Sequence, residues 1–324
     1  MLKLLSKRVL FLIIIVLAEI TTVNAQDPEF TQFYANPLYL NPAFAGTARC
    51  PRIAMNYRNQ WPSLSGTYVT TSASYDQHLD GIYGGLGLIV TNDQAGEATL
   101  KTTTINAMYS YQLKVSRKFS VRVGVQAGYF QRSLDWNKLT FGDMIDARRG
   151  FVYQTNDVPR GGTIGNVDFS AGILGFSDQF YFGFAAHHLT QPNESVIVGN
   201  SPLPMKFTGH FGAVIPMSNS KYQDNVAKIS PNILFRSQGT FNQLNIGLYV
   251  TKNNLVGGVW YRNKDAFIVL VGIQTNHFKL GYSYDLTSSK LGTISGGSHE
   301  LSMGLNFNCK PKKRSFRTIS CPSF

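Results

Sequence analysis

Apolar and polar side chains alternate one by one along most of this chain, and this pattern limits the fold more than any other feature. Residues 301–307 read Leu-Ser-Met-Gly-Leu-Asn-Phe, and residues 121–129 read Val-Arg-Val-Gly-Val-Gln-Ala-Gly-Tyr. A period of two places one apolar and one polar face on a β-strand. The chain is therefore predicted to be an all-β protein.

The amino terminus has the three parts of a secretory signal peptide. A basic start precedes an unbroken apolar stretch at 9–17, and Val-Asn-Ala at 23–25 is a small-residue cleavage site. The apolar stretch is far shorter than the roughly 20 residues that a membrane-spanning helix needs. We predict that residues 1–25 are removed and that the mature chain is exported. Export excludes nucleic acid as the expected partner.

Export and alternation together favour a membrane barrel over a soluble sandwich. The apolar positions alternate with Gly, Asn, Gln and Arg, and the chain holds 30 Gly, 16 Tyr and 22 Phe but only 15% charged residues. The longest later apolar run, 266–272, is too short for a spanning helix. We predict a transmembrane antiparallel β-barrel of about fourteen strands at 51–309, in the outer membrane and in contact with its lipid.

The alternation defines fourteen predicted strands, and the connections between them are unequal. The strands are 51–60, 67–77, 84–93, 99–113, 119–133, 166–176, 178–188, 205–217, 226–237, 241–251, 254–263, 266–275, 277–286 and 299–309. Long connections at 134–165 and 189–204 alternate with mostly short turns, as in outer-membrane barrels. With both termini in the periplasm, the long connections face the outside. Arg122, Gln126, Asn245 and Asn306 are predicted to face a polar lumen.

Motifs for chemistry are scarce, so we expect no enzyme, metal or cofactor. The six histidines do not fall into metal-ligand spacings, and neighbouring His187 and His188 are expected on opposite faces of a strand. His299 and Ser302 are also expected on opposite faces, which argues against a hydrolase pair. The glycines at 84–87 lie in a predicted strand, where they let strands pack or bend.

The cysteines and tryptophans leave alternatives open. Cys309 and Cys321 are close enough to bridge within the tail, and a bridge that uses Cys50 is the rival. The tail, 310–324, is basic and is either a docking element or solvated. The three tryptophans are candidates for aromatic girdles at the membrane surface or for packing inside the barrel or a loop; they are Trp61, Trp136 and Trp260.

Residues 26–50 do not alternate and form a separate element. Prolines at 28, 37 and 42 would break strand ladders, and two Asn-Pro turns follow each other at Asn36-Pro37 and Asn41-Pro42. We predict a plug in the lumen or a periplasmic segment below it. Five aromatic side chains lie on this segment: Phe30, Phe33, Tyr34, Tyr39 and Phe44.

Several motifs in a fixed order resemble the PorP/SprF membrane proteins of the type IX secretion and gliding systems. They are the two Asn-Pro turns, Arg58 and Trp61 in Tyr-Arg-Asn-Gln-Trp, Asp76, Asn92-Asp93 with Gly96, His188-Leu189 with Pro192, and the carboxyl end from Tyr284 to Phe324. The resemblance implies an outer-membrane barrel that works with the type IX machine, which exports cargo bearing a folded carboxyl-terminal signal domain.

Two functional classes follow from these observations. In the first, implied by the resemblance, the barrel docks type IX components or cargo signal domains, and the five aromatic residues shape the contact surface. Tyr34→Ala and Tyr39→Ala would then weaken cargo capture; the alternative is a segment that only seals the lumen. In the second class, the barrel is a channel for small hydrophobic molecules like the fatty-acid transporters, which share Asn-Pro-Ala, here at 41–43.

Overall fold

A computed structural model describes residues 27–64, 66, 68–96, 99–146, 148–156, 162–196, 199–217, 226–288 and 294–308. The predicted signal peptide at 1–25 and the basic tail at 310–324 lie outside these residues. No helix in the described ranges is long and apolar enough to cross a membrane.

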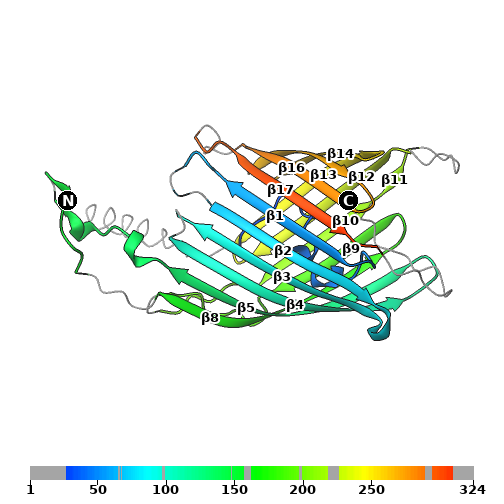
Figure 1. Cartoon of the computed structure of the whole chain (residues 1–324), viewed down its shortest axis with the longest axis horizontal. Helices are drawn as coiled ribbons and strands as arrows, with labels where there is room; N and C mark the ends of the chain where they lie inside the picture. The colour runs from blue at the N-terminus through cyan, green and yellow to red at the C-terminus, as the bar shows by residue number, and fades with distance from the viewer. Residues whose placement is uncertain are drawn as a thin grey trace, which may run out of the picture.

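Fourteen long antiparallel strands close into a barrel (Figure 1), which confirms the predicted fold and strand number. In chain order they are β1 Arg52–Gln60, β2 Tyr68–Leu79, β3 Gly84–Ala95, β4 Leu100–Lys114, β5 Ser120–Leu134, β8 Thr163–Phe176, β9 Phe180–His187, β10 Lys206–Ala213, β12 Lys228–Gln238, β13 Phe241–Lys252, β14 Leu255–Arg262, β15 Ala266–Gln274, β16 Phe278–Thr287 and β17 Ser298–Asn306. Two pairings close the ring, β1 with β17 and β10 with β12. Closure leaves no open sheet edge in the hydrocarbon.

The alternation places apolar side chains outward, as predicted. On β5, Val123 and Val125 are exposed on the outside of the barrel. Arg122, the residue before Val123, is buried in the lumen. Asn245 on β13 is also fully buried inside. An outward apolar band and an inward polar face are the features of a membrane barrel.

One predicted strand is divided and one is longer than expected. The predicted strand 205–217 becomes β10 and a short β11, Ile215–Pro216, which pairs with β12 in the same register as β10. β8 begins at Thr163, three residues before the predicted start, because it pairs with β5 along its whole length.

The amino-terminal segment lies inside the barrel, where Figure 1 shows it behind the front strands. We call residues 27–47 the plug. It contains a helical turn, α2 Pro37–Leu40, and a 3-10 turn, η1 Pro42–Phe44. Its buried side chains, together with inward side chains from the wall, make the hydrophobic core of the molecule. The core is therefore the interface between plug and wall.

The long connections gather at one end of the barrel, which we call the long-loop end. Residues 135–162 carry η3 Trp136–Lys138, η4 Gly142–Met144 and a small hairpin of β6 Ile145–Asp146 with β7 Gly150–Phe151. The opposite, short-turn end includes η2 Asp80–Ile82 and the turns at 115–119 and 275–277.

Cys50 is disulfide-bonded in the structure. The chain has three cysteines, and Cys309 and Cys321 lie outside the described residues. The bridge predicted between Cys309 and Cys321 therefore stays a prediction, as does the choice of partner for Cys50. The Phe307 N–H bonds to the Pro51 carbonyl at 2.9 Å, so β1 begins beside the end of β17.

Candidate functional site

Glycines in the wall form a seat for the plug backbone. A Cβ added to Gly85 on β3 would overlap the carbonyl of Ala45, and one added to Gly124 on β5 would overlap the backbone nitrogen of Ala43. Glycine lets two backbones approach more closely than any other residue allows. The glycine stretch that the sequence offered as packing positions therefore accommodates the plug.

The second Asn-Pro turn is locked to the wall by its asparagine. The fully buried Asn41 side chain donates to the carbonyls of Ile173 at 3.1 Å and Phe184 at 3.2 Å. Its oxygen accepts from the Ala43 N–H at 2.9 Å and caps η1. Gly172 leaves room for this side chain, because a Cβ there would overlap it.

Four buried charged side chains lie on the inner wall, and we call them the charge cluster: Arg58, Arg262, Asp285 and Glu300. Arg58 lies 2.9 Å from Asp285 and 3.4 Å from Glu300, and Arg262 lies 3.3 Å from Asp285. Two cations and two anions balance. Buried charges without such partners would be costly.

The charge cluster holds the plug through its backbone and one hydroxyl. Glu300 accepts from the N–H groups of Thr31 at 2.5 Å and Gln32 at 3.0 Å. The Thr31 hydroxyl donates to Asp285 at 2.7 Å and accepts from Arg58 and from Arg262. The segment at 31–32 therefore cannot leave without removing two N–H donors from Glu300 and the hydroxyl that links Asp285 to the two arginines.

Asp76 fixes the far end of the plug. Its carboxylate accepts from the Gly46 N–H at 2.8 Å and from Arg52 on β1 at 2.8 Å and 3.0 Å. Near the first Asn-Pro turn, the Asn36 amide donates to the Ser72 hydroxyl at 2.7 Å.

Six of the seven residues singled out as family motif thus lie in the plug or hold it: Asn36, Pro37, Asn41, Pro42, Arg58 and Asp76. Pro37 and Pro42 each begin a helical turn of the plug. Trp61 instead lies at the long-loop end, where its backbone N–H donates to the Gly297 carbonyl at 2.9 Å. The motif that carries the resemblance is therefore mostly a plug-fixing motif.

The start of the plug is tied to the wall by a second ionic group, which we call the clasp: Asp27, Asp168, His188 and Lys206. His188 lies between two carboxylates, 2.8 Å from Asp27 and 2.7 Å from Asp168. Lys206 also forms an ion pair with Asp27. The backbone N–H of Asp27 donates to the side-chain oxygen of Gln238 at 3.1 Å.

The clasp predicts a pH dependence for the plug. Burial alone would lower the pKa of His188, but the charge of Asp27 and hydrogen bonds to Asp168 and Asp27 outweigh it and raise the pKa to about 9. Burial would raise the pKa of Asp27, but the charges of His188 and Lys206 hold it well below its usual value. His187, Glu194 and Lys206 are further titratable groups whose charges interact with His188.

The sign follows from these directions. His188 contributes fully below its ordinary pKa of about 6.5, and its contribution, roughly 3 kcal/mol in all, is lost as the pH rises through about 9. Asp27 contributes above about pH 4 and loses its contribution as the pH falls through its lowered pKa. The test compares the rate at which chymotrypsin cuts near Phe30 in wild type and in His188→Gln. We expect the ratio of the wild-type rate to the variant rate to increase as the pH rises from about 6.5 to 9.5. A constant ratio between the two proteins across this range would contradict the clasp.

The aromatic side chains of the plug are not available as a contact surface. Phe30, Phe33, Tyr34 and Phe44 are buried and Tyr39 is half-buried. The barrel wall covers these side chains, whereas the prediction that they contact a partner requires them to be exposed. The rings pack edge to face with Trp260 and Tyr181 or stack on His210, and Phe30 packs on Tyr39. Their position fits the alternative, a segment that seals the lumen.

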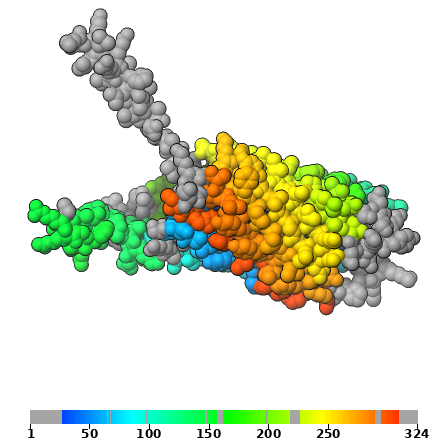
Figure 2. All heavy atoms as spheres, turned by 90° about the horizontal axis from the view of Figure 1, so that it is seen from above, coloured from blue at the N-terminus to red at the C-terminus, as the bar shows by residue number. Residues whose placement is uncertain are grey.

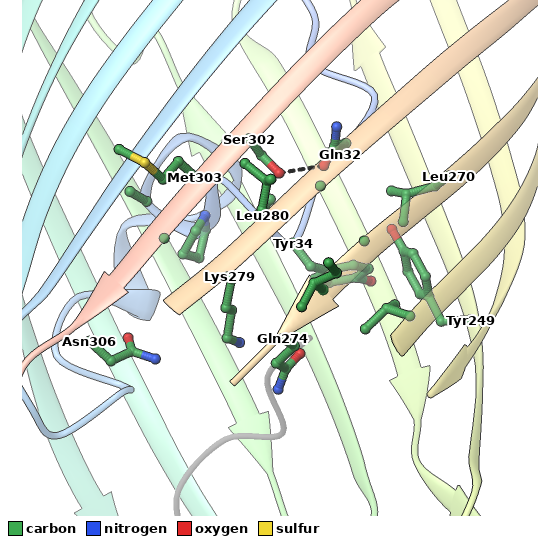
Figure 3. Close-up of a pocket in the computed structure, with 18 of the residues that line it drawn as sticks. Gln32, Tyr34, Tyr249, Leu270, Gln274, Lys279, Leu280, Ser302, Met303 and Asn306 are labelled. Atoms are coloured by element: carbon green, nitrogen blue, oxygen red, sulfur yellow. Dashed lines mark hydrogen bonds between the residues drawn. The ribbon is translucent and has the colours of Figure 1, made fainter. Parts of the chain in front are cut away.

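The plug separates two cavities. The first, about 110 Å³, lies toward the long-loop end, and its lining includes Tyr39, Asp93 and Arg132. The second, about 80 Å³, lies toward the short-turn end (Figure 3), where Lys279 and Gln274 lie near the ends of their strands. In this view the Ser302 hydroxyl donates to the Gln32 side chain at 2.5 Å and ties the plug to β17.

The structure shows on which face of the sheet the histidines of the two predicted pairs lie. Ser302 faces the lumen and His299 faces outward to Tyr282, as predicted. The expectation for His187 and His188 is wrong: β9 ends at His187, and a φ of 58° at His188 turns both rings toward one cavity.

Trp260 packs inside the barrel and Trp136 stacks on Phe141 in a loop, so neither is a girdle residue. In the described part of the chain, no group of three or more His, Cys, Asp or Glu side chains is placed to hold a metal ion.

Sequence reasoning missed the importance of the clasp and of most of the charge cluster. A signal existed: Arg262, Asp285 and Glu300 fall on the inward parity of strands whose other faces are apolar. A charge at an inward position of a membrane barrel needs a partner, either a wall residue or a plug.

The model of a family described as "Type IX secretion system membrane protein PorP/SprF" matches residues 22–305. No curated protein matches the chain. Among solved structures, the CymD monoaromatic hydrocarbon channel is 12% identical, with 84% of this chain and 93% of that chain covered at a TM-score of 0.45. A Pseudomonas aeruginosa FadL homologue is also 12% identical, with 83% and 93% covered at a TM-score of 0.43.

Proposed function

We propose a function for this outer-membrane barrel from the premise that the chain belongs to the PorP/SprF family of type IX secretion system membrane proteins. The barrel is a non-enzymatic docking protein. It binds components of the type IX machine or the carboxyl-terminal signal domain of secreted cargo and adhesins, and lipid surrounds its outward apolar side chains.

The observation that carries this proposal is the fixed plug. Residues 27–47 fill the lumen and are held by the glycine seat, the charge cluster, Asp76 and the clasp. Each attachment lies on a different part of the wall, so a solute path would require several buried ionic contacts to break together. A plugged barrel leaves its exposed ends as the surfaces that can act.

Two measurements on the full chain test the proposal. We expect deletion of the gene to abolish surface display of a subset of type IX cargo. We also expect liposomes that contain the purified barrel to take up labelled fatty acid no faster than empty liposomes. Barrel-dependent uptake, with cargo display intact in the deletion strain, would instead establish the channel for small hydrophobic molecules.

A further inference from the structure

The connection between β5 and β8 forms an arm that projects from the long-loop end. In Figure 1 its green segments lie at the far left, beyond the ends of β5 and β8, and Figure 2 shows the same projection from above. The arm contains η3, η4 and the hairpin of β6 and β7, all between 136 and 151. It therefore stands outside the part of the barrel that lipid surrounds.

The hairpin of the arm exposes four large apolar side chains, which we call the arm patch. They are Ile145, Phe151, Val152 and Tyr153, and each is 50% to 63% exposed. Ile145 and Phe151 are directly opposed in the hairpin. Exposed apolar side chains on the strands face lipid, but lipid does not reach the arm. A cluster of this kind on a water-exposed element marks an interaction surface.

The arm is ordered from within by its acidic residues. Asp143 accepts from the Asn156 N–H at 2.7 Å and the Thr155 hydroxyl at 3.0 Å. Asp146 accepts from the N–H groups of Arg148 and Arg149 at 2.8 Å and 2.9 Å. A two-stranded hairpin alone is only marginally stable in water, so these bonds hold the patch in shape while it is uncovered.

The same bonds leave positive charge at the tip. The Arg148 and Arg149 residues are exposed, and neither guanidinium forms an ion pair with a described residue. The Asp146 carboxylate beside them is used by backbone N–H groups and by the Tyr153 hydroxyl at 3.1 Å. Two guanidinium groups next to an apolar patch complement carboxylates that border an apolar centre.

We propose that the arm patch, with Arg148 and Arg149, is the surface on which a protein partner docks, and that the partner presents an apolar centre bordered by carboxylates. This inference rests on the proposed docking function and names its surface. The aromatic and aliphatic side chains supply the buried centre of the contact, and the two guanidinium groups select an acidic partner.

The test uses the full chain in its own cells, with p-benzoylphenylalanine placed at position 153 for photo-crosslinking. We expect a protein adduct whose yield falls about tenfold or more in Phe151→Ser/Val152→Ser and in Arg148→Glu/Arg149→Glu. Surface display of cargo should fall with it. Arg148→Lys/Arg149→Lys keeps the charge and should keep most of the adduct.

Matched controls lie at the opposite end of the barrel, in the turn between β4 and β5. Val115→Ser and Arg117→Glu/Lys118→Glu change equally exposed side chains there and should leave adduct and display unchanged. All variants are first checked for wild-type levels of folded barrel by the heat-dependent shift in detergent gels.

The outcomes separate this inference from the proposed function. Wild-type adduct and display in both arm variants, with display lost in the gene deletion, would overturn the arm and keep the docking function. Adducts to lipid alone would also overturn the arm. Intact display in the gene deletion would overturn the docking function itself.

Discussion

Gly124→Leu is expected to prevent the plug from seating while the barrel still closes. The added side chain would overlap the backbone of Pro42 and Ala43. Neither this plug backbone nor the backbone of β5 can move aside as a flexible side chain can. Overpacking of a core costs about 1–3 kcal/mol, and the rigid neighbours place this site at the upper end or beyond. We expect chymotrypsin to cut the variant between Phe30 and Phe44 under conditions in which wild type is protected.

Gly209→Leu is the matched control for this substitution. Gly209 lies on β10 and faces outward, and a Cβ added there meets nothing within 4 Å. The control should keep the protected plug and the folded barrel. Equal protection of the plug in both variants would show that the glycine seat does not determine whether the plug docks.

Arg58→Ala is expected to destabilise the folded protein by about 3–5 kcal/mol, because it leaves Glu300 without its cation and the charge cluster with a net negative charge. The measurement is the temperature at which the heat-dependent gel shift occurs in detergent. A drop of only a degree or two would mean that water or a rearranged side chain replaces the guanidinium.

A double variant separates lost attraction from uncompensated charge. Arg58→Met/Glu300→Met removes one cation and one anion and leaves the Arg262–Asp285 pair at 3.3 Å. It should be less destabilised than Arg58→Ala, although the Thr31 and Gln32 N–H groups lose their acceptor. If it is destabilised by the sum of the two single changes, the four groups do not act as one cluster.

The alternating pattern by itself determined the barrel, its fourteen strands and which side chains face lipid. This was possible because strand period is a local property: once Val123 faces outward, Arg122 and Gly124 must face inward. The Asn-Pro turns and prolines also separated residues 26–50 from the strands by local backbone chemistry alone.

Only the tertiary structure decided what the inward groups do. Arg58 and Asp285 are 227 residues apart in sequence and meet because the barrel closes through β1 and β17. The local sequence of the plug also could not show whether its aromatic side chains contact a partner or the wall, because the same residues suit either role. Long-range contacts follow from register and closure of the whole sheet, which no single segment of the sequence encodes.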